Sequence, residues 1–327
     1  MEKTIRWGIV GLGNIAAKFA KDLALVKGGV LTAVASRSGE KAREFSKEFN
    51  AEYAFDSYED LFLSDAVDVV YIALPHTEHR HWSILAMQRG KHVLCEKPMG
   101  VNTEEVAAMI QASKDHKVFL MEALWTRFNP AIRKAKDMAD KGELGTLSYL
   151  HADFSFYGLD RDPEGRILNP ALAGGSLLDI GIYPVFLAYV MLGLPESITS
   201  FAKFHKTGAE IQISILFDYP NAHALLHSGL AGNSVMEASI TGSEGTVIVH
   251  PRWHETQGLT FIKDDQEEKL EFTKLGKGYT YEIEEVHQCL REHKLESALW
   301  SHQNSMELIG LLDRIREQMG IRFPFEE

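Results

Sequence analysis

Three residues far apart in the sequence carry side chains suited to moving a proton to or from a hydroxyl group: Lys97, Asp179 and Tyr183. Lys97 lies in Glu96-Lys97-Pro98, directly after an apolar run typical of a strand. Proline removes a backbone donor and biases the preceding residue toward extended geometry, so the strand has to stop there and the lysine projects from its carboxyl end. Ligands bind at that edge of an open parallel sheet, although a solvated lysine remains the alternative.

The second candidate group lies in the segment 174–184, which begins with Gly174-Gly175 and contains Asp179 and Tyr183. A helix that begins after the glycines puts Asp179 and Tyr183, four residues apart, on one face. An N-cap role for Ser176 and a core role for Tyr183 are the structural alternatives. Two glycines, an interior glycine and a proline all weaken a helix, and such local inconsistency favours a functional segment.

A glycine-rich turn near the amino terminus predicts a cofactor. An apolar strand over 5–10 is followed by Gly11-Leu12-Gly13-Asn14-Ile15-Ala16 and then by a helical pattern, which is the dinucleotide fingerprint in its expected context. Gly11 permits the tight turn and Gly13 lets the backbone approach a pyrophosphate. The amides at the helix start, from Asn14 and Ile15, then face the phosphates.

The end of the next strand predicts which nicotinamide cofactor is used. An NAD-binding enzyme usually has an acidic residue there, whereas this chain has Ser36-Arg37-Ser38. A guanidinium matches a 2'-phosphate in charge and geometry, so we expect NADP rather than NAD. Glu40 remains a second candidate for the ribose, in which case Arg37 merely begins a charged helix.

The order of expected elements predicts an α/β protein with two domains. Strands and helices alternate over residues 1–124, which predicts a doubly wound parallel sheet, the dinucleotide-binding Rossmann domain. Residues 125–327 show runs of strands joined by turns, which predict an α+β domain with one large, predominantly antiparallel sheet. Trp125, at the expected boundary, either packs between the domains or covers the cofactor.

Three histidines follow the fourth expected strand, at positions 76, 79 and 81. No second cluster completes a ligand shell, so no metal is expected. Their place at the carboxyl edge of the sheet instead makes His79 a candidate neighbour of the nicotinamide or the substrate.

The composition limits the partners. The chain has 327 residues, 45% hydrophobic content and a net charge of -12 without a polybasic run, which argues against nucleic acid or an anionic membrane as a partner. The two cysteines, Cys95 and Cys289, form no disulfide framework. Residues 1–4 lead directly into a strand without a signal sequence, so the expected location is the cytoplasm.

Together these motifs resemble the glucose-fructose oxidoreductase and inositol dehydrogenase family, written Gfo/Idh/MocA, over essentially the whole chain. The stretches 35–37, 121–128 and 178–183 are most similar to the branch of dimeric dihydrodiol dehydrogenases and NADP-dependent D-xylose dehydrogenases. Many members have histidine where Tyr183 stands, and His76 stands where the usual residue is asparagine. The resemblance implies hydride exchange at a sugar or cyclic diol carbon and a homodimer formed through the second sheet.

The resemblance also implies the site residues. Lys97 is the catalytic lysine, with Asp179 and Tyr183 as its partners. A free tyrosine titrates at a pKa of about 10, and a nearby ammonium favours its ionised form. Either Tyr183 or Lys97 transfers the proton. The residues expected to bind the cofactor are Gly11, Gly13, Asn14, Ile15, Ser36, Arg37, His76, His79, Glu96, Lys97 and Trp125.

Two other functions remain open, a catalytically silent NADP-binding sensor and a reductase of another sugar or ketose. The residues that would select the substrate carry no recognised motif. Polar candidates are His151, Asp153, Tyr157 and Arg161, with the loops near Trp253.

Overall fold

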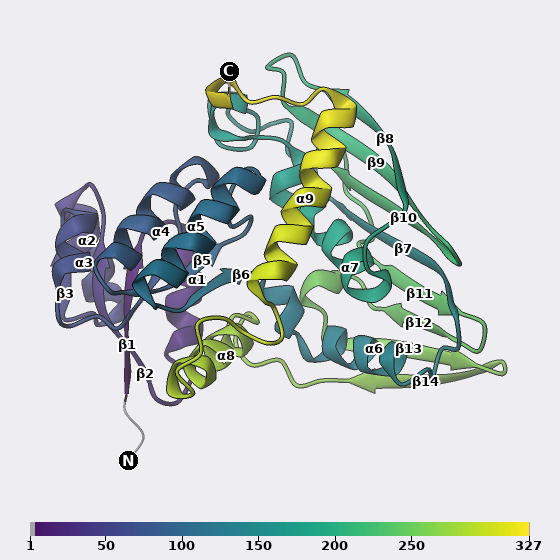
Figure 1. Ribbon diagram of the computed structural model, residues 1–327, viewed down its shortest axis with the longest axis horizontal. Coiled ribbons are helices and arrows are strands. Elements are labelled where there is room, and N and C mark those ends of the chain that lie inside the picture. Colours follow the sequence, from purple (N-terminus) through teal and green to yellow (C-terminus); the bar gives the residue numbers. More distant parts are fainter. Residues whose placement is uncertain (1–3, 327) are drawn as a thin grey trace. The chain divides into compact units, whose positions relative to one another are not determined.

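The computed structural model describes residues 4–326, which divide into two compact units (Figure 1). Unit 1 contains the chain up to Phe128 together with Lys274–Met306, and unit 2 contains Asn129–Thr273 and the chain from Glu307 on. Unit 1 therefore includes a late segment that the sequence assigns to the second domain. The expected features of Met1–Lys3 lie outside the described residues.

The sheet of unit 1 is parallel throughout, with strand order β3-β2-β1-β4-β5-β6. This order is that of a dinucleotide-binding Rossmann domain, which confirms the expected fold class. The strands are β1 (Ile5–Val10), β2 (Gly29–Ala35), β3 (Tyr53–Phe55), β4 (Val69–Ile72), β5 (His92–Glu96) and β6 (Leu120–Ala123). The helices are α1 (Asn14–Leu23), α2 (Gly39–Phe49), α3 (Tyr58–Leu63), α4 (His79–Gln88), α5 (Thr103–His116) and α8 (Thr280–Arg291).

Successive residues of β1 show how both faces of this sheet are covered, because strand side chains alternate between faces. Trp7 contacts Phe19 of α1 and donates its indole N–H to His287 Nε2 of α8 at 2.9 Å. A Cβ at the next residue, Gly8, would lie 2.9 Å from Leu61 of α3. Helix α8, which is distant in sequence, therefore completes one face of the core.

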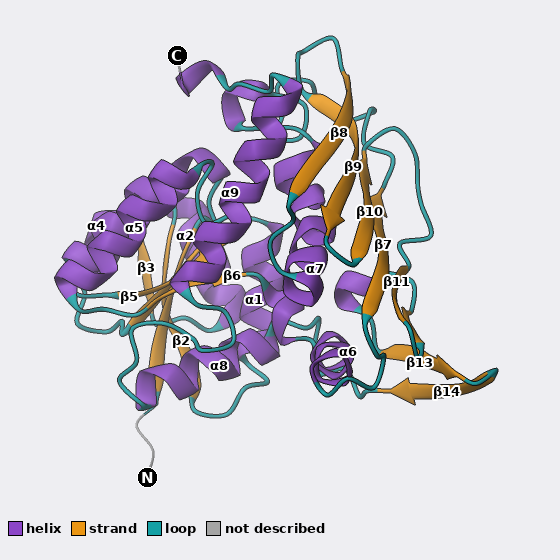
Figure 2. Ribbon diagram, turned by 45° about the vertical axis from the view of Figure 1, so that its right-hand side comes forward, coloured by secondary structure: helices purple, strands orange, loops and turns teal. Residues whose placement is uncertain are grey.

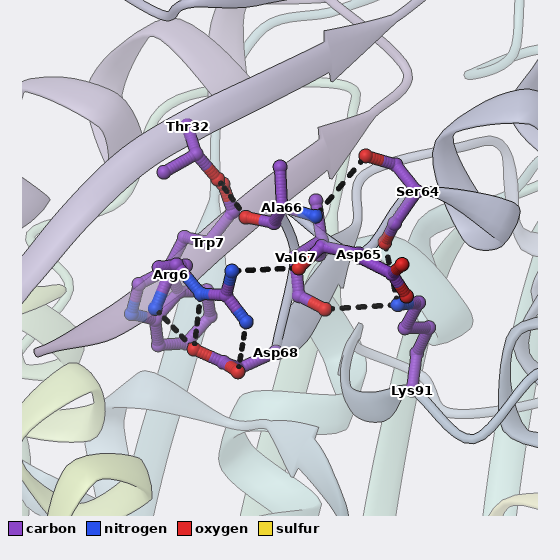
Figure 3. A network of polar contacts seen from close by, with 9 residues as sticks. All are labelled: Arg6, Trp7, Thr32, Ser64, Asp65, Ala66, Val67, Asp68 and Lys91. Carbon is purple, nitrogen blue, oxygen red and sulfur yellow. Dashed lines mark hydrogen bonds and ion pairs between the residues drawn. The ribbon is translucent and has the colours of Figure 1, made fainter. Parts of the chain in front are cut away.

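A polar network joins β1, the turn before β4 and the turn before β5 (Figure 3). Arg6 donates from its backbone N–H, Nε and Nη2 to the carboxylate of Asp68 at 2.8–3.0 Å. Lys91 Nζ donates to the carbonyls of Ser64 and Val67 at 2.7 and 2.9 Å. These bonds hold the amino ends of the strands and leave the carboxyl ends to other residues.

The sheet of unit 2 has strand order β14-β13-β12-β11-β7-β10-β9-β8. It is antiparallel except that β7 and β10 run parallel, which agrees with the expected, predominantly antiparallel sheet. Strand β14, which lacks apolar alternation, was not predicted. The strands are β7 (Leu147–Ser155), β8 (Ser197–Phe204), β9 (Glu210–Tyr219), β10 (Ala222–Gly229), β11 (Ala238–Gly242), β12 (Thr246–Val249), β13 (Gly258–Lys263) and β14 (Gln266–Glu271).

Helices α6 (Pro130–Asp140) and α7 (Ile182–Leu192) lie along one face of this sheet (Figure 2). Helix α9 (His302–Met319) begins in unit 1 and ends in unit 2. Among residues 4–326, the stretch Pro170–Leu192 is apolar and long enough to span a membrane, but 89% of its most apolar window is buried inside the protein. It is therefore typical of the core helix of a soluble protein.

Candidate active site

The glycine turn after β1 leaves the start of α1 open. Gly11 has φ of +84°, and a Cβ there would lie 2.4 Å from the carbonyl oxygen of Ala73, so only glycine fits. A Cβ on Gly13 would meet no described atom within 4 Å. Within the described residues no side chain caps the α1 amides, which begin with Asn14 and Ile15. The start of α1 therefore fits the pyrophosphate of a dinucleotide.

Arg37 lies in the turn between β2 and α2, where it is exposed and hydrogen-bonds the Tyr58 side chain. Burial raises the pKa of the Tyr58 hydroxyl, and the Arg37 charge acts in the opposite direction. Ser36 Oγ accepts the Ser38 N–H at 3.2 Å and so shapes this turn. Glu40 lies in the first turn of α2. Sequence reasoning missed Tyr58, because a residue at a helix start gives no sign of a contact 21 positions back in the chain.

Lys97 follows β5 and is half-buried, and its peptide bond to Pro98 is cis. The preceding residue, Glu96, accepts hydrogen bonds from the Tyr71 hydroxyl of β4 and, at 3.1 Å, from the Lys97 N–H. Burial, followed by the negative charge of Glu96, raises the pKa of Tyr71 well above its usual value. Tyr71 therefore remains a donor and fixes the carboxylate beside Lys97.

Two buried side chains hold the other flank of Lys97. His79 is fully buried, with Nδ1 2.8 Å from the Pro98 carbonyl oxygen and Nε2 2.9 Å from that of Leu74. Burial lowers the pKa of His79, and a neutral imidazole donates to one of these two carbonyls. Glu122 accepts the Met99 N–H at 2.9 Å. Lys97 is thus the half-buried centre of a rigidly held turn, and His79 contributes to that rigidity.

Aromatic and acidic side chains from α8, the turn before it and the short helix Trp125–Phe128 lie in the same unit. Trp125 is buried and stacks on Tyr279, with 4.9 Å between ring centroids. Glu282 is fully buried, and neither of its carboxyl oxygens has a hydrogen-bond partner among the described residues. Burial, followed by the charges of Glu96 and Asp22, raises the pKa of the Glu282 carboxyl group well above its usual value. His76 begins the short 3-10 helix His76–Glu78 after β4 and is half-buried, with its ring centroid 5.8 Å from that of His79.

Asp179 and Tyr183 lie in unit 2, in the segment that leads into α7. The turn Leu177–Gly181 is a π-helix, a wider turn than the α-helix expected from the sequence, and such turns are frequent at functional sites. Asp179 accepts a hydrogen bond from Arg166 Nη1 at 2.8 Å. Tyr183 is 5% exposed, and its ring lies 5.4 Å from Phe154 and 5.5 Å from His254 between centroids.

The polar residues considered for substrate selection differ in exposure. Tyr157 and Arg161 are exposed, whereas His151 and Asp153 are half-buried. Trp253 is fully buried and donates its indole N–H to the Asp153 carbonyl oxygen at 2.8 Å, which makes it a core residue. Within residues 4–326, no group of three histidine, cysteine or acidic side chains is placed to hold a metal ion.

The parallel sheet with an open glycine turn defines an NAD(P)-binding Rossmann domain, here joined to a second unit with a large sheet. The family comparisons agree. Residues 5–124 match the model of an oxidoreductase family with an NAD-binding Rossmann fold, and residues 132–248 match the GFO/IDH/MocA C-terminal domain. The chain belongs to the Gfo/Idh/MocA family and is an oxidoreductase.

Curated relatives match along nearly the whole chain. A mouse trans-1,2-dihydrobenzene-1,2-diol dehydrogenase is 34% identical over 98% of both chains. The scyllo-inositol 2-dehydrogenase (NADP(+)) IolU of Bacillus subtilis is 33% identical over 99% of both. Among solved structures, the 3-ketoreductase KijD10 of Actinomadura kijaniata in complex with NADP and TDP-benzene superposes with a TM-score of 0.87 at 24% identity, covering 97% of this chain and 98% of that one. An aldose-aldose oxidoreductase of Caulobacter crescentus gives 0.88 at 24% identity, covering 97% of both. These two likenesses show the fold.

Proposed function

We propose that this enzyme is an NADP-dependent dehydrogenase that acts on a hydroxyl-bearing carbon of a sugar or a cyclic diol. The observation that carries the proposal is the rigidly held Lys97 at the carboxyl end of β5, in a chain 34% identical to a diol dehydrogenase. The inositol dehydrogenase relative, whose name includes NADP(+), supports the same class of substrate and the same cofactor.

NADP, when bound, accepts or donates the hydride of the reaction. We infer that the α1 amides bind its pyrophosphate and that Arg37, supported by Tyr58, binds its 2'-phosphate. The absence of an acid at the end of β2 supports this preference over NAD.

Proton transfer falls to the chain's own residues. We infer that the Lys97 ammonium favours the phenolate form of Tyr183, and that this phenolate takes the proton from the substrate hydroxyl and becomes a neutral phenol. Asp179, whose carboxylate is paired with Arg166, orients Lys97 or a substrate hydroxyl. In the rival assignment Lys97 itself transfers the proton.

The first test is a substrate panel. The purified protein is incubated with NADP or NAD and with pentoses, hexoses, inositols and cyclic diols, or with NADPH and ketoses, while absorbance of the reduced cofactor is followed. We expect turnover on a member of the panel with a preference for NADP, and a reduction of this preference by at least about tenfold in Arg37→Ala. Tight NADPH binding without turnover would favour the silent sensor.

The second test separates the two assignments of the proton-transfer residue. Tyr183→Phe should lower kcat by roughly two to four orders of magnitude and leave the NADPH dissociation constant unchanged, because only the hydroxyl is lost. Lys97→Met, which retains the length and removes the charge, should have an effect of similar size. Wild-type turnover in Tyr183→Phe together with a large loss in Lys97→Met would assign proton transfer to Lys97.

The uncovered face of the unit 2 sheet supports a homodimer. Strand registers place Leu216 opposite Leu225 and Phe201 opposite Ser214, so these side chains share the face that α7 does not cover. Phe201 is 73% exposed, and Leu216, Leu225 and Tyr149 are also exposed. We propose that a second copy covers this face, and light scattering should give a dimer that Phe201→Asp converts to a monomer. We also propose a cytoplasmic location, an environment in which free cysteines such as the buried Cys95 and Cys289 stay reduced.

A further inference from the structure

The segment that carries Asp179 and Tyr183 begins on a buried carboxyl group from another strand. Glu210, the first residue of β9, is 2% exposed. Its carboxyl group accepts the Leu177 N–H and forms a hydrogen bond with the Ser176 side chain. Amide groups at a helix start lack partners within the helix, so a buried start requires such an acceptor. Glu210, which lies outside the segment Leu177–Gly181, therefore acts as the N-cap that the segment's own residues do not provide.

The two glycines at 174 and 175 are explained by close approaches rather than by flexibility. Gly175 has φ of +141°, and a Cβ there would lie 1.7 Å from Glu210 Oε2. A Cβ on Gly174 would lie 2.7 Å from the carbonyl oxygens of Arg166 and Asn169. Gly174 thus lets the backbone of Arg166 come close, and the guanidinium of Arg166 pairs with Asp179. Gly175 lets the Glu210 carboxyl group come close.

A second strand holds the same turn. Ser176 Oγ lies 3.0 Å from Ser228 Oγ of β10, and either hydroxyl can donate. A Cβ on Gly181 would lie 2.8 Å from that same Ser228 oxygen. Both ends of the π-helical turn Leu177–Gly181 are therefore in contact with the sheet, through Glu210 at its start and Ser228 near its end.

From this geometry we propose that Glu210 is a positioning residue for the reaction: it sets the π-helical turn so that Asp179 and Tyr183 are presented to the substrate. Ser228 assists from β10. This inference rests on the proposed function only for the roles of Asp179 and Tyr183. The contacts of Glu210 themselves do not depend on it.

The charges that face Glu210 are consistent with this role. Burial raises the pKa of Glu210 to about 7, while its hydrogen bonds and the Arg316 charge act in the opposite direction. Arg316 is itself buried and paired with Asp313 and Glu326. The Leu177 N–H retains an acceptor oxygen in both protonation states of Glu210, so the cap persists across the neutral range.

The test compares Glu210→Ala, which removes the acceptor, with Glu210→Gln, which keeps an acceptor oxygen of similar reach. A displacement of the reacting groups by an ångström costs about 100-fold in rate, so Glu210→Ala should lower kcat by that order. Its NADPH dissociation constant should stay within about twofold of wild type, since the α1 turn is unchanged. Glu210→Gln should recover most of kcat. Hydrogen exchange at the Leu177 amide should be faster in Glu210→Ala alone.

A matched control acts on the same helix. Glu307 accepts a hydrogen bond from the Tyr189 hydroxyl, six residues beyond Tyr183. Glu307→Ala removes a half-buried carboxylate contact without touching the π-helical turn, so its kcat should equal that of wild type. A mere loss of stability would affect both variants alike and would leave kcat per folded molecule unchanged.

The outcomes separate the two proposals. An inactive wild type on every substrate refutes the proposed function, whereas the exchange measurement still tests the cap. An active wild type with unchanged kcat in Glu210→Ala overturns the positioning role, as does an equal loss in Glu307→Ala or in Glu210→Gln. If Glu210→Ala does not fold, Ser228→Ala replaces it; about a tenfold loss of kcat with unchanged NADPH binding is then expected, and wild-type kcat overturns the inference.

Discussion

Two glycine turns in this protein, at Gly13 and Gly175, precede helical segments. They differ in whether another side chain occupies the space beside the glycine. At Gly13 a Cβ would meet no described atom within 4 Å, and no described side chain caps the α1 amides. At Gly175 the same position is filled by Glu210, whose carboxyl group takes the Leu177 N–H. The open helix start at Gly13 is available to bind an external anion. The start at Gly175 is occupied by the Glu210 carboxyl group, which fixes the position of the backbone there. The group that lies beside each glycine, rather than the glycine itself, therefore determines its role.

A third turn, at Gly276, resembles the turn at Gly175 because an acidic side chain occupies the space beside the glycine. Gly276 has φ of +64°, and a Cβ there would lie 2.3 Å from Asp22 Oδ1. The Asp22 carboxylate accepts the N–H groups of Lys277, Gly278 and Tyr279 at 2.9–3.0 Å, just before α8. An internal acid thus anchors the late segment of unit 1 in the same manner.

The largest expected effect is the change with pH in the contribution of Glu210, at the Gly175 turn, to the free energy of unfolding. The folded pKa of Glu210, about 7, lies above the value of about 4.5 for an unperturbed glutamate, so the folded state binds the proton more tightly. Its contribution to stability is therefore greatest below pH 4.5 and is lost as pH rises through 7. In Glu210→Gln this loss disappears, and the difference in unfolding free energy between variant and wild type should change by about 3 kcal/mol between pH 4.5 and pH 8.5. Urea titrations at the two pH values measure it. A constant difference would contradict the prediction.

The next effect closes the open turn. Gly13 has φ of -93°, which other residues adopt, so Gly13→Asp places a carboxylate at the α1 start without backbone strain. Repulsion of the pyrophosphate should weaken NADPH binding by roughly 100-fold, or about 2.7 kcal/mol, as measured by the fluorescence of the reduced nicotinamide. Gly13→Ala is the control for added bulk and should lose less. An unchanged melting temperature in both variants distinguishes lost binding from lost folding.

The smallest effect tests the third turn. Asp22→Asn keeps one acceptor oxygen and removes the charge that three amides share, so unfolding should be easier by about 1.5 kcal/mol. The urea midpoint measures the change. Because Asp22 contacts neither the open turn nor Lys97, NADPH affinity should remain at the wild-type value. A loss of affinity instead would show that the α8 segment supports the cofactor.

The parts predicted from the sequence are those whose signals are local. The Gly11-to-Ala16 turn lies within six residues, and the alternation of strands and helices up to Ala123 predicted the parallel sheet. Apolar alternation likewise predicted most strands of unit 2. Helix α6 also had a local signal, Asn129 as N-cap followed by proline at the first helical position, but it was missed.

The parts that could not be predicted depend on long-range register. Glu210 caps Leu177 across 33 residues, and the sequence of β9 alone does not say what its first residue contacts. The pairing of Arg166 with Asp179 depends on the loop geometry around Gly174. The anchoring of the Lys97 turn by Tyr71, His79 and Glu122 was likewise visible only after the strands were in order.

The division of unit 1 between two stretches of chain has a consequence for the order of synthesis. When the ribosome has made every strand of the parallel sheet, Trp7 still lacks His287, and Glu122 still lacks the indole N–H of Trp300, which lies 3.0 Å from it in the finished protein. The strands of unit 2 emerge next. A nascent chain that ends before residue 274 therefore carries the open α1 turn on an incomplete core, and the nucleotide-binding unit finishes folding only after the whole second sheet has been made.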